Sequence, residues 1–159
     1  IANFETALGY KNFNLQAEYI NNFDIELSSD QNTDFNRTGY YVQLSYFLTG
    51  EHRNFRTNCA TVGGIKVKNP VENGGIGAWE FAARYSELDA RSVDTRFNEG
   101  KSYDYTAGVN WYLNNYSRIM FDYSKNYTDY NYKGMTPSDF GKDDNEQYDV
   151  YSVRFQVNF

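Results

Sequence analysis

Apolar and polar residues alternate one by one through the final stretch of the chain, YDVYSVRFQVNF, which covers 148–159. The apolar positions are Tyr151, Val153, Phe155, Val157 and Phe159, and the polar positions between them are Ser152, Arg154, Gln156 and Asn158. Successive side chains of a β-strand point to opposite faces, so this stretch predicts a strand with one apolar and one polar face. In a soluble protein the apolar face would pack on a core. In a membrane barrel it would face lipid, and the polar face would line the lumen.

The same alternation occurs in six segments upstream. Their apolar positions are Phe4, Leu8 and Tyr10; Leu15, Ala17, Tyr19, Phe23 and Ile25; Tyr40, Val42, Leu44, Tyr46 and Leu48; Trp79, Phe81, Ala83 and Tyr85; Tyr103, Tyr105, Ala107, Val109, Trp111 and Leu113; and Ile119, Phe121, Tyr123 and Tyr127. No segment shows the period of about 3.6 residues that marks an amphipathic helix. The sequence therefore predicts an all-β chain with seven strands.

The connections between these strands alternate in length. Tight turns are predicted near 11–12 and 114–115, and longer polar connections are predicted at 28–37, 90–101 and 133–145. Outer-membrane barrels have short periplasmic turns and longer extracellular loops, so up-and-down order would place the tight turns in the periplasm. The connection at 50–77 is an exception, because it belongs to the tight-turn side and is long. A connection of that size without its own periodicity is usually functional or mobile.

Composition favours strands in a two-sided environment. Aromatic residues make up 19% of the 159 residues, with 16 Tyr and 12 Phe. Aromatic residues suit strands, and near strand ends, as with Trp111, Tyr103, Tyr105 and Tyr151, they fit the interfacial girdles of a membrane barrel. The interior of a small soluble barrel would be too narrow for so many rings. The longest apolar runs have three residues, whereas a transmembrane helix needs about 20.

Charge and cysteine content exclude several classes of function. The net charge of −6 argues against a protein that reads nucleic acid. Cys59 is the only Cys and His52 the only His, so no disulfide framework, metal centre or cofactor is predicted. Glu80 and Asp104 are conceivable catalytic carboxylates, but nothing pairs them with a nucleophile, so no enzyme is predicted. The chain begins with Ile1 and shows no signal peptide, so we expect a mature or truncated product.

Several stretches resemble the C-terminal part of the phosphate-selective porin O and P family of bacterial outer membranes. They are LQAEY at 15–19, GYYVQLSYFLTGEHR at 39–53, VKNP at 67–70, GAWEFAARYS at 77–86 and GVNWYLN at 108–114. Together they span nearly the whole chain and follow the order found in the family.

The resemblance implies an outer-membrane barrel of about sixteen strands, often trimeric, that passes small anionic or other polar solutes, including phosphate. It also implies that Phe159 belongs to the signal read by the barrel-assembly machinery. Family members are more than twice as long as this chain, and seven strands would leave two unpaired edges in lipid. We therefore expect 1–159 to be the C-terminal part of a single larger barrel domain, or one piece of an assembly.

The functional surface of a pore is its polar face. Counting parity from Phe159 predicts that this face carries the acids Glu5, Glu18, Glu80, Asp104 and Asp122 and the bases Arg84, Arg118 and Arg154. Charges along a pore tune which ions enter and how strongly they bind. The alternative is that these charges neutralise each other across strands and only hold the wall together. Hairpin geometry would place Arg154 close to Asp122 or Ser124.

The connection at 50–77 is the second candidate. It is basic, and two Gly-Gly steps indicate a pliable segment that would fold into the pore mouth and attract anions. Its candidate anion-attracting residues are Arg53, Arg56, Lys66 and Lys68. The alternative is a solvated periplasmic loop.

These patterns favour a diffusion channel embedded in outer-membrane lipid. Two alternatives stay open at this point. One is a structural barrel that anchors other envelope proteins and conducts little, and the other is a soluble ligand-binding barrel of the lipocalin kind.

Overall fold

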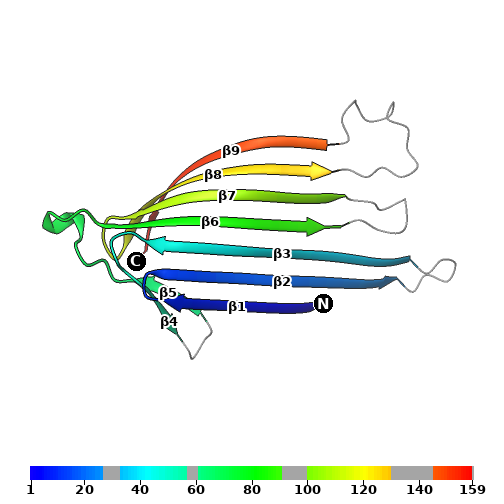
Figure 1. The fold of residues 1–159 in the computed structure, drawn as a ribbon, viewed down its shortest axis with the longest axis horizontal. Helices are drawn as coiled ribbons and strands as arrows, with labels where there is room; N and C mark the ends of the chain where they lie inside the picture. The colour runs from blue at the N-terminus through cyan, green and yellow to red at the C-terminus, as the bar shows by residue number, and fades with distance from the viewer. Residues whose placement is uncertain (27–32, 57–60, 91–99, 130–144, 159) are drawn as a thin grey trace.

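Seven long strands form one antiparallel sheet in the computed structural model, which describes residues 1–26, 33–56, 61–90, 100–129 and 145–158. Neighbouring strands follow chain order throughout the sheet (Figure 1). The strands are β1 (Ala2–Tyr10), β2 (Phe13–Glu26), β3 (Thr33–Phe47), β6 (Ala78–Asp89), β7 (Lys101–Tyr112), β8 (Ser117–Asp129) and β9 (Asn145–Val157). The predicted all-β, up-and-down arrangement of seven strands is confirmed.

Strand boundaries agree with the predicted connections except in one place. The β2–β3 ladder continues until Glu26 pairs with Thr33, so β3 begins inside the expected connection at 28–37. Positive φ at Lys11, 54°, marks the tight turn between β1 and β2. The sheet ends at β1 on one side and at β9 on the other. No helix among the described residues is long and apolar enough to span a membrane.

Unbroken registers give the sheet two chemically different faces. In the six ladders of the sheet, paired residues lie on the same face, so parity carries over from each strand to the next. The apolar face includes one row across all seven strands: Leu8, Leu15, Leu44, Ala83, Ala107, Tyr123 and Tyr151. The polar face includes another such row: Glu5, Glu18, Tyr41, Ser86, Asp104, Asn126 and Tyr148.

The apolar face is not packed on a protein core. Val153 is 72% exposed and Phe155 is 64% exposed, and both lie on the apolar face of β9. A soluble sheet would bury such residues, whereas a membrane sheet turns them toward lipid. This exposure argues against the soluble-barrel alternative.

Aromatic side chains flank the apolar band at both strand ends. Near the tight turns, Trp79 and Trp111 stack with ring centroids 5.2 Å apart, and each indole donates a hydrogen bond to the Ile76 carbonyl, at 3.2 and 2.9 Å. Toward the other end, Tyr103 stacks on Tyr127 at 4.8 Å. Amphipathic rings favour membrane–water interfaces, so the two groups sit where the predicted girdles belong.

The long connection between β3 and β6 has secondary structure of its own. It contains a two-stranded hairpin, β4 (Arg53–Arg56) and β5 (Thr61–Ile65), and a 3₁₀ turn, η1 (Val71–Asn73). Figure 1 shows the hairpin beside the tight-turn ends of the strands. The sequence showed no periodicity here because these elements are too short to display one.

The connection is fixed to the tight-turn end by packing and by hydrogen bonds. Phe47, Val67, Ala78 and Tyr112 form a small buried cluster between the connection and the sheet. The Val67 N–H donates to the Asn115 side-chain oxygen at 2.9 Å, and the Val71 N–H donates to the Leu113 carbonyl at 2.9 Å. At Gly77, where φ is 71°, a Cβ atom would collide with the Tyr112 carbonyl, so the return into β6 requires glycine.

Candidate functional site

All eight charged residues predicted for the polar face lie on that face. The ladders align Glu5 with Glu18, Arg84 with Thr106, and Asp122 with Ser152, all on the side that carries Gln43 and Ser124. The full set is Glu5, Glu18, Glu80, Arg84, Asp104, Arg118, Asp122 and Arg154. Because the opposite face is apolar and exposed, this charged face is the candidate functional surface of the chain.

Glu80 is the centre of a buried network at the tight-turn end. Its side chain is completely buried and forms an ion pair with Arg53 of the β4–β5 hairpin, whose Nη2 lies 2.8 Å from both carboxylate oxygens. Tyr112 Oη donates to Glu80 Oε2 at 2.8 Å, and Asn110 Nδ2 donates to the same oxygen at 3.0 Å. An ionised carboxylate that is buried away from solvent is stable only when it is paired with a cation and hydrogen-bonded. The contacts of Glu80 meet that requirement.

Arg118 extends this network toward β9. Its Nη1 donates to Tyr112 Oη at 3.0 Å, while its Nε and Nη2 donate to Gln156 Oε1 at 3.0 and 2.8 Å. Arg53 and Arg118 line a cavity of about 210 Å³ between the hairpin and the sheet. The network therefore connects the hairpin to the polar face through a chain of charged and polar side chains.

The four basic residues predicted in the connection have different environments. Burial lowers the pKa of Arg53, but electrostatic attraction to Tyr112 and Glu80, together with hydrogen bonds to both, outweighs burial and raises the pKa above the ordinary arginine value. Arg53 therefore remains a cation held by Glu80. The Lys68 ammonium donates to the Gly50 carbonyl at 2.6 Å, and Lys66 is exposed. Arg56 ends β4, and its side chain lies outside what the structure describes.

Buried Glu51 fixes the start of the connection. Only 1% of this residue is exposed. Its carboxylate accepts hydrogen bonds from the Thr49 hydroxyl and, at 3.3 Å, from the Lys68 N–H. Through these bonds Lys68 is tied to the first residues of the connection, in addition to the tie between Arg53 and Glu80.

The remaining charges of the polar face are distributed along the strands. Asp104 accepts hydrogen bonds from the hydroxyls of Ser86 and, at 2.9 Å, Thr106. Asp122 accepts one from Ser152 at 3.3 Å. Arg154 pairs with Met120 in the ladder, so Asp122 is its diagonal neighbour rather than its direct partner.

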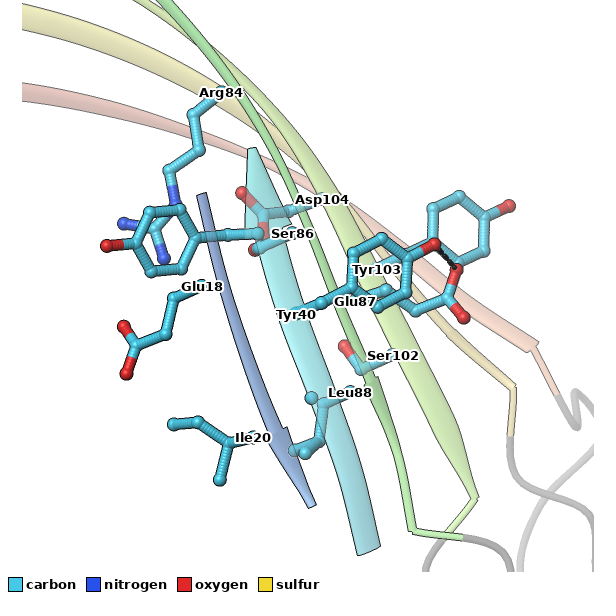
Figure 2. Close-up of a pocket in the computed structure, with 12 residues that line it drawn as sticks. Glu18, Ile20, Tyr40, Arg84, Ser86, Glu87, Leu88, Ser102, Tyr103 and Asp104 are labelled. Carbon is cyan, nitrogen blue, oxygen red and sulfur yellow. Dashed lines mark hydrogen bonds between the residues drawn. The ribbon is translucent and has the colours of Figure 1, made fainter. Parts of the chain in front are cut away.

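A second cavity, of about 270 Å³, lies nearer the other end of the strands. Figure 2 shows Glu18, Ile20 and Arg84 on one side of the sheet there, and Glu87 and Tyr103 on the other. The first three belong to the polar face.

Several residues of these sites were not among the predicted site residues. Tyr112, Asn110 and Gln156 complete the Glu80 network. The ring of Tyr41 makes a cation–π contact with the Arg84 guanidinium. Strand parity could have found them, because alternation along each strand puts all four on the polar face. Phe159 lies outside the described residues, and among the described ones no group of His, Cys, Asp and Glu is arranged to hold a metal.

Comparison with known proteins agrees with this geometry. Residues 2–159 match the family described as phosphate-selective porin O and P. The chain is 36% identical over 126 residues to Porin O of Pseudomonas aeruginosa, covering 74% of this chain and 27% of that protein. It is 30% identical over 121 residues to an uncharacterized protein of Caulobacter vibrioides, covering 76% of this chain and 23% of that protein. The chain thus spans about a quarter of the length of these relatives.

The sheet has one charged face and one exposed apolar face, and the family match covers nearly the whole chain. The chain therefore belongs to the phosphate-selective porin O and P family of the bacterial outer membrane.

Proposed function

We propose that this chain forms part of the wall of a water-filled channel for the diffusion of small polar solutes, anions included. The single observation that carries the proposal is the division of the sheet into a charged face and an exposed apolar face with aromatic flanks. In a barrel with this arrangement, the apolar face contacts lipid and the charged face contacts water in the lumen. No catalytic role is proposed.

The seven strands would be completed by strands outside this sequence. β1 and β9 lie at opposite edges of the sheet, and unpaired edge groups in lipid cost several kcal/mol each. A barrel of about sixteen strands would close them. Trimer formation, and recognition of Phe159 by the barrel-assembly machinery, belong to the same proposal and rest on the family alone.

The intact mass of the protein extracted from its native outer membrane tests this closure. We expect a mass well over twice the 18.5 kDa of this chain, because the proposal puts the strands that complete the barrel on the same polypeptide. Mass spectrometry of the purified protein gives the answer. A mass equal to that of this chain would contradict the single-barrel proposal and require a partner chain to close the sheet.

Conductance across planar bilayers tests the channel itself. The protein as purified from the outer membrane is expected to give steady open levels in KCl. The alternative is a structural barrel with a plugged lumen. It is supported by the β4–β5 hairpin, which is held at Glu80 and occupies space over the polar face. Absence of any open level in correctly folded protein would favour that alternative.

The ion preference of the channel should depend on arginines of the polar face. Replacing Arg84 or Arg154 with Glu removes a positive charge and adds a negative one, so cation preference is expected to rise. Both residues are exposed, so folding should be largely unaffected. The measurement is the reversal potential in a KCl gradient, and Lys11→Glu in the β1–β2 turn serves as control. A reversal potential that does not move in either variant would contradict lumen placement of these residues.

A further inference from the structure

The cavity at the end of the strands opposite the Glu80 network combines opposite charges with apolar surface. It has a volume of about 270 Å³ and lies apart from the Glu80 network. On the polar face its lining includes Glu18, Ile20, Tyr41, Arg84, Leu88 and Asp104, while Tyr40, Glu87 and Tyr103 line it from the opposite face. Ligand pockets for drug-sized molecules are about 300–1,000 Å³, so a smaller solute suits this one.

Arg84 presents hydrogen-bond donors to this cavity. Its guanidinium lies 4.3 Å from the centroid of the Tyr41 ring, which fixes the plane of the group by a cation–π contact. Within the described ranges, the Arg84 guanidinium has no hydrogen bond and no ion pair with the protein. A stacked guanidinium with available N–H groups is suited to a carboxylate, which it can bind with two parallel hydrogen bonds.

Glu18 supplies a negative charge beside the same ring. It pairs with Tyr41 across β2 and β3, and Tyr41 interacts electrostatically with both Glu18 and Arg84. Glu18 accepts a hydrogen bond from the exposed Asn3 amide at 3.3 Å, and the Tyr41 hydroxyl is a second hydrogen-bond partner. An ionised carboxylate has about four acceptor sites, so Glu18 can still accept a bond from a solute. Because it lies beside the ring on which Arg84 stacks, Glu18 is the carboxylate that we expect to meet an ammonium group.

Two aliphatic side chains complete the cavity. Ile20 and Leu88 lie on either side of Gly39 in the ladders, and they are 40% and 52% exposed on the polar face. Gly39 has no side chain, so a recess remains between them, with Leu88 Cδ1 at 3.5 Å from where a Cβ atom would be. In Figure 2, Ile20 and Leu88 lie on the same side of the sheet as Glu18. They offer apolar contact next to the charged side chains of Glu18 and Arg84.

We propose that this cavity is a binding site for a zwitterionic solute with an apolar side chain, namely a free amino acid. Arg84 binds its carboxylate, Glu18 binds its ammonium group, and the recess between Ile20 and Leu88 takes its side chain. A plain anion would meet Glu18 beside Arg84, and a plain cation would meet Arg84 beside Glu18, so each is disfavoured relative to the zwitterion. The inference rests on the proposed channel function, because it places this face in contact with passing solutes.

Saturation-transfer NMR on the detergent-solubilised full-length protein tests the site with four probes. L-leucine is compared with 4-methylpentanoate, which lacks the amino group, with 3-methylbutylamine, which lacks the carboxylate, and with glycine, which lacks the side chain. Loss of a charge-assisted hydrogen bond weakens binding by about tenfold or more. We therefore expect both single-charge probes to bind at least about tenfold more weakly than L-leucine, and glycine to bind more weakly too. Equal affinity of 4-methylpentanoate and L-leucine would overturn the proposal in favour of a simple anion site.

Variants separate the two charges. Glu18→Gln and Arg84→Gln are each expected to weaken L-leucine binding about tenfold, and only Arg84→Gln should also weaken 4-methylpentanoate. Asp122→Asn, on the same face but outside the cavity, is the matched control. Unchanged L-leucine affinity in both cavity variants would overturn the assignment. Conductance in KCl is recorded in parallel: L-leucine binding without open levels would refute the channel alone, and open levels without L-leucine binding would refute this site alone.

Discussion

Replacing Glu80 with Ala is expected to lower the free energy of unfolding of the full-length protein by about 3–5 kcal/mol. The substitution removes the acceptor of Arg53, Tyr112 and Asn110 at a position that is completely buried. Arg53 is only 19% exposed, so its charge would be left largely without water or a partner. Urea unfolding of the protein in lipid vesicles, followed by tryptophan fluorescence, measures the loss.

Two further variants show whether the loss arises from the ion pair. Replacing both Glu80 and Arg53 with Met removes both charges and should cost much less than Glu80→Ala, because no unpaired charge remains. Glu72→Ala changes an exposed carboxylate in the same connection, and its effect should stay within about 0.5 kcal/mol. A loss below about 1 kcal/mol for Glu80→Ala would mean that water or another side chain replaces the carboxylate, and that the hairpin is not held as the structure shows.

Replacing Phe121 with Arg is expected to destabilise the protein by about 2–4 kcal/mol. Phe121 lies in the middle of β8 on the apolar face, between Val109 and Val153 in the ladders, and it is 46% exposed. An arginine there would have to enter the hydrocarbon region of the bilayer. Val109→Arg should behave in the same way. Unfolding in vesicles and the yield of folded protein in the outer membrane measure both variants.

Ser152→Arg provides the matched control for this experiment. Ser152 is the ladder partner of Asp122, which is next to Phe121 in the chain but on the opposite face. An arginine at this position would meet water and the Asp122 carboxylate, so we expect little loss of stability. If Phe121→Arg assembled normally while Ser152→Arg did not, the two faces would be inverted and the lumen would lie on the aromatic side.

Strand positions and their two faces could be predicted from the sequence. The alternation of Ile119, Phe121 and Tyr123 with Arg118 and Asp122 assigns each side chain to one face, and the ladders of β8 confirm the assignment. The prediction succeeds because the side-chain period of a strand is two residues, and because neighbouring strands are joined in chain order. An error of one residue in any register would have moved every side chain of that strand to the other face.

The β2–β3 connection shows where local pattern was not sufficient. The polar stretch expected at 28–37 looked like a loop, yet β3 begins at Thr33 and pairs with the end of β2. Strands of an outer-membrane barrel extend beyond the lipid into water, where neither face needs to be apolar. Alternation disappears there while the backbone ladder continues.

The sequence by itself determined the all-β class, the strand order and the face on which each charge lies, because these follow from a short period and from contacts between consecutive strands. Only the tertiary structure decided that Arg53 pairs with Glu80, that the β4–β5 hairpin lies against the polar face, and that Arg84 stacks on Tyr41. The first two contacts join a connection without a periodic pattern to side chains far along the chain, so no local rule specifies them. The third depends on where a long, flexible arginine side chain finds an aromatic partner, and that is decided by neighbouring strands rather than by its own sequence.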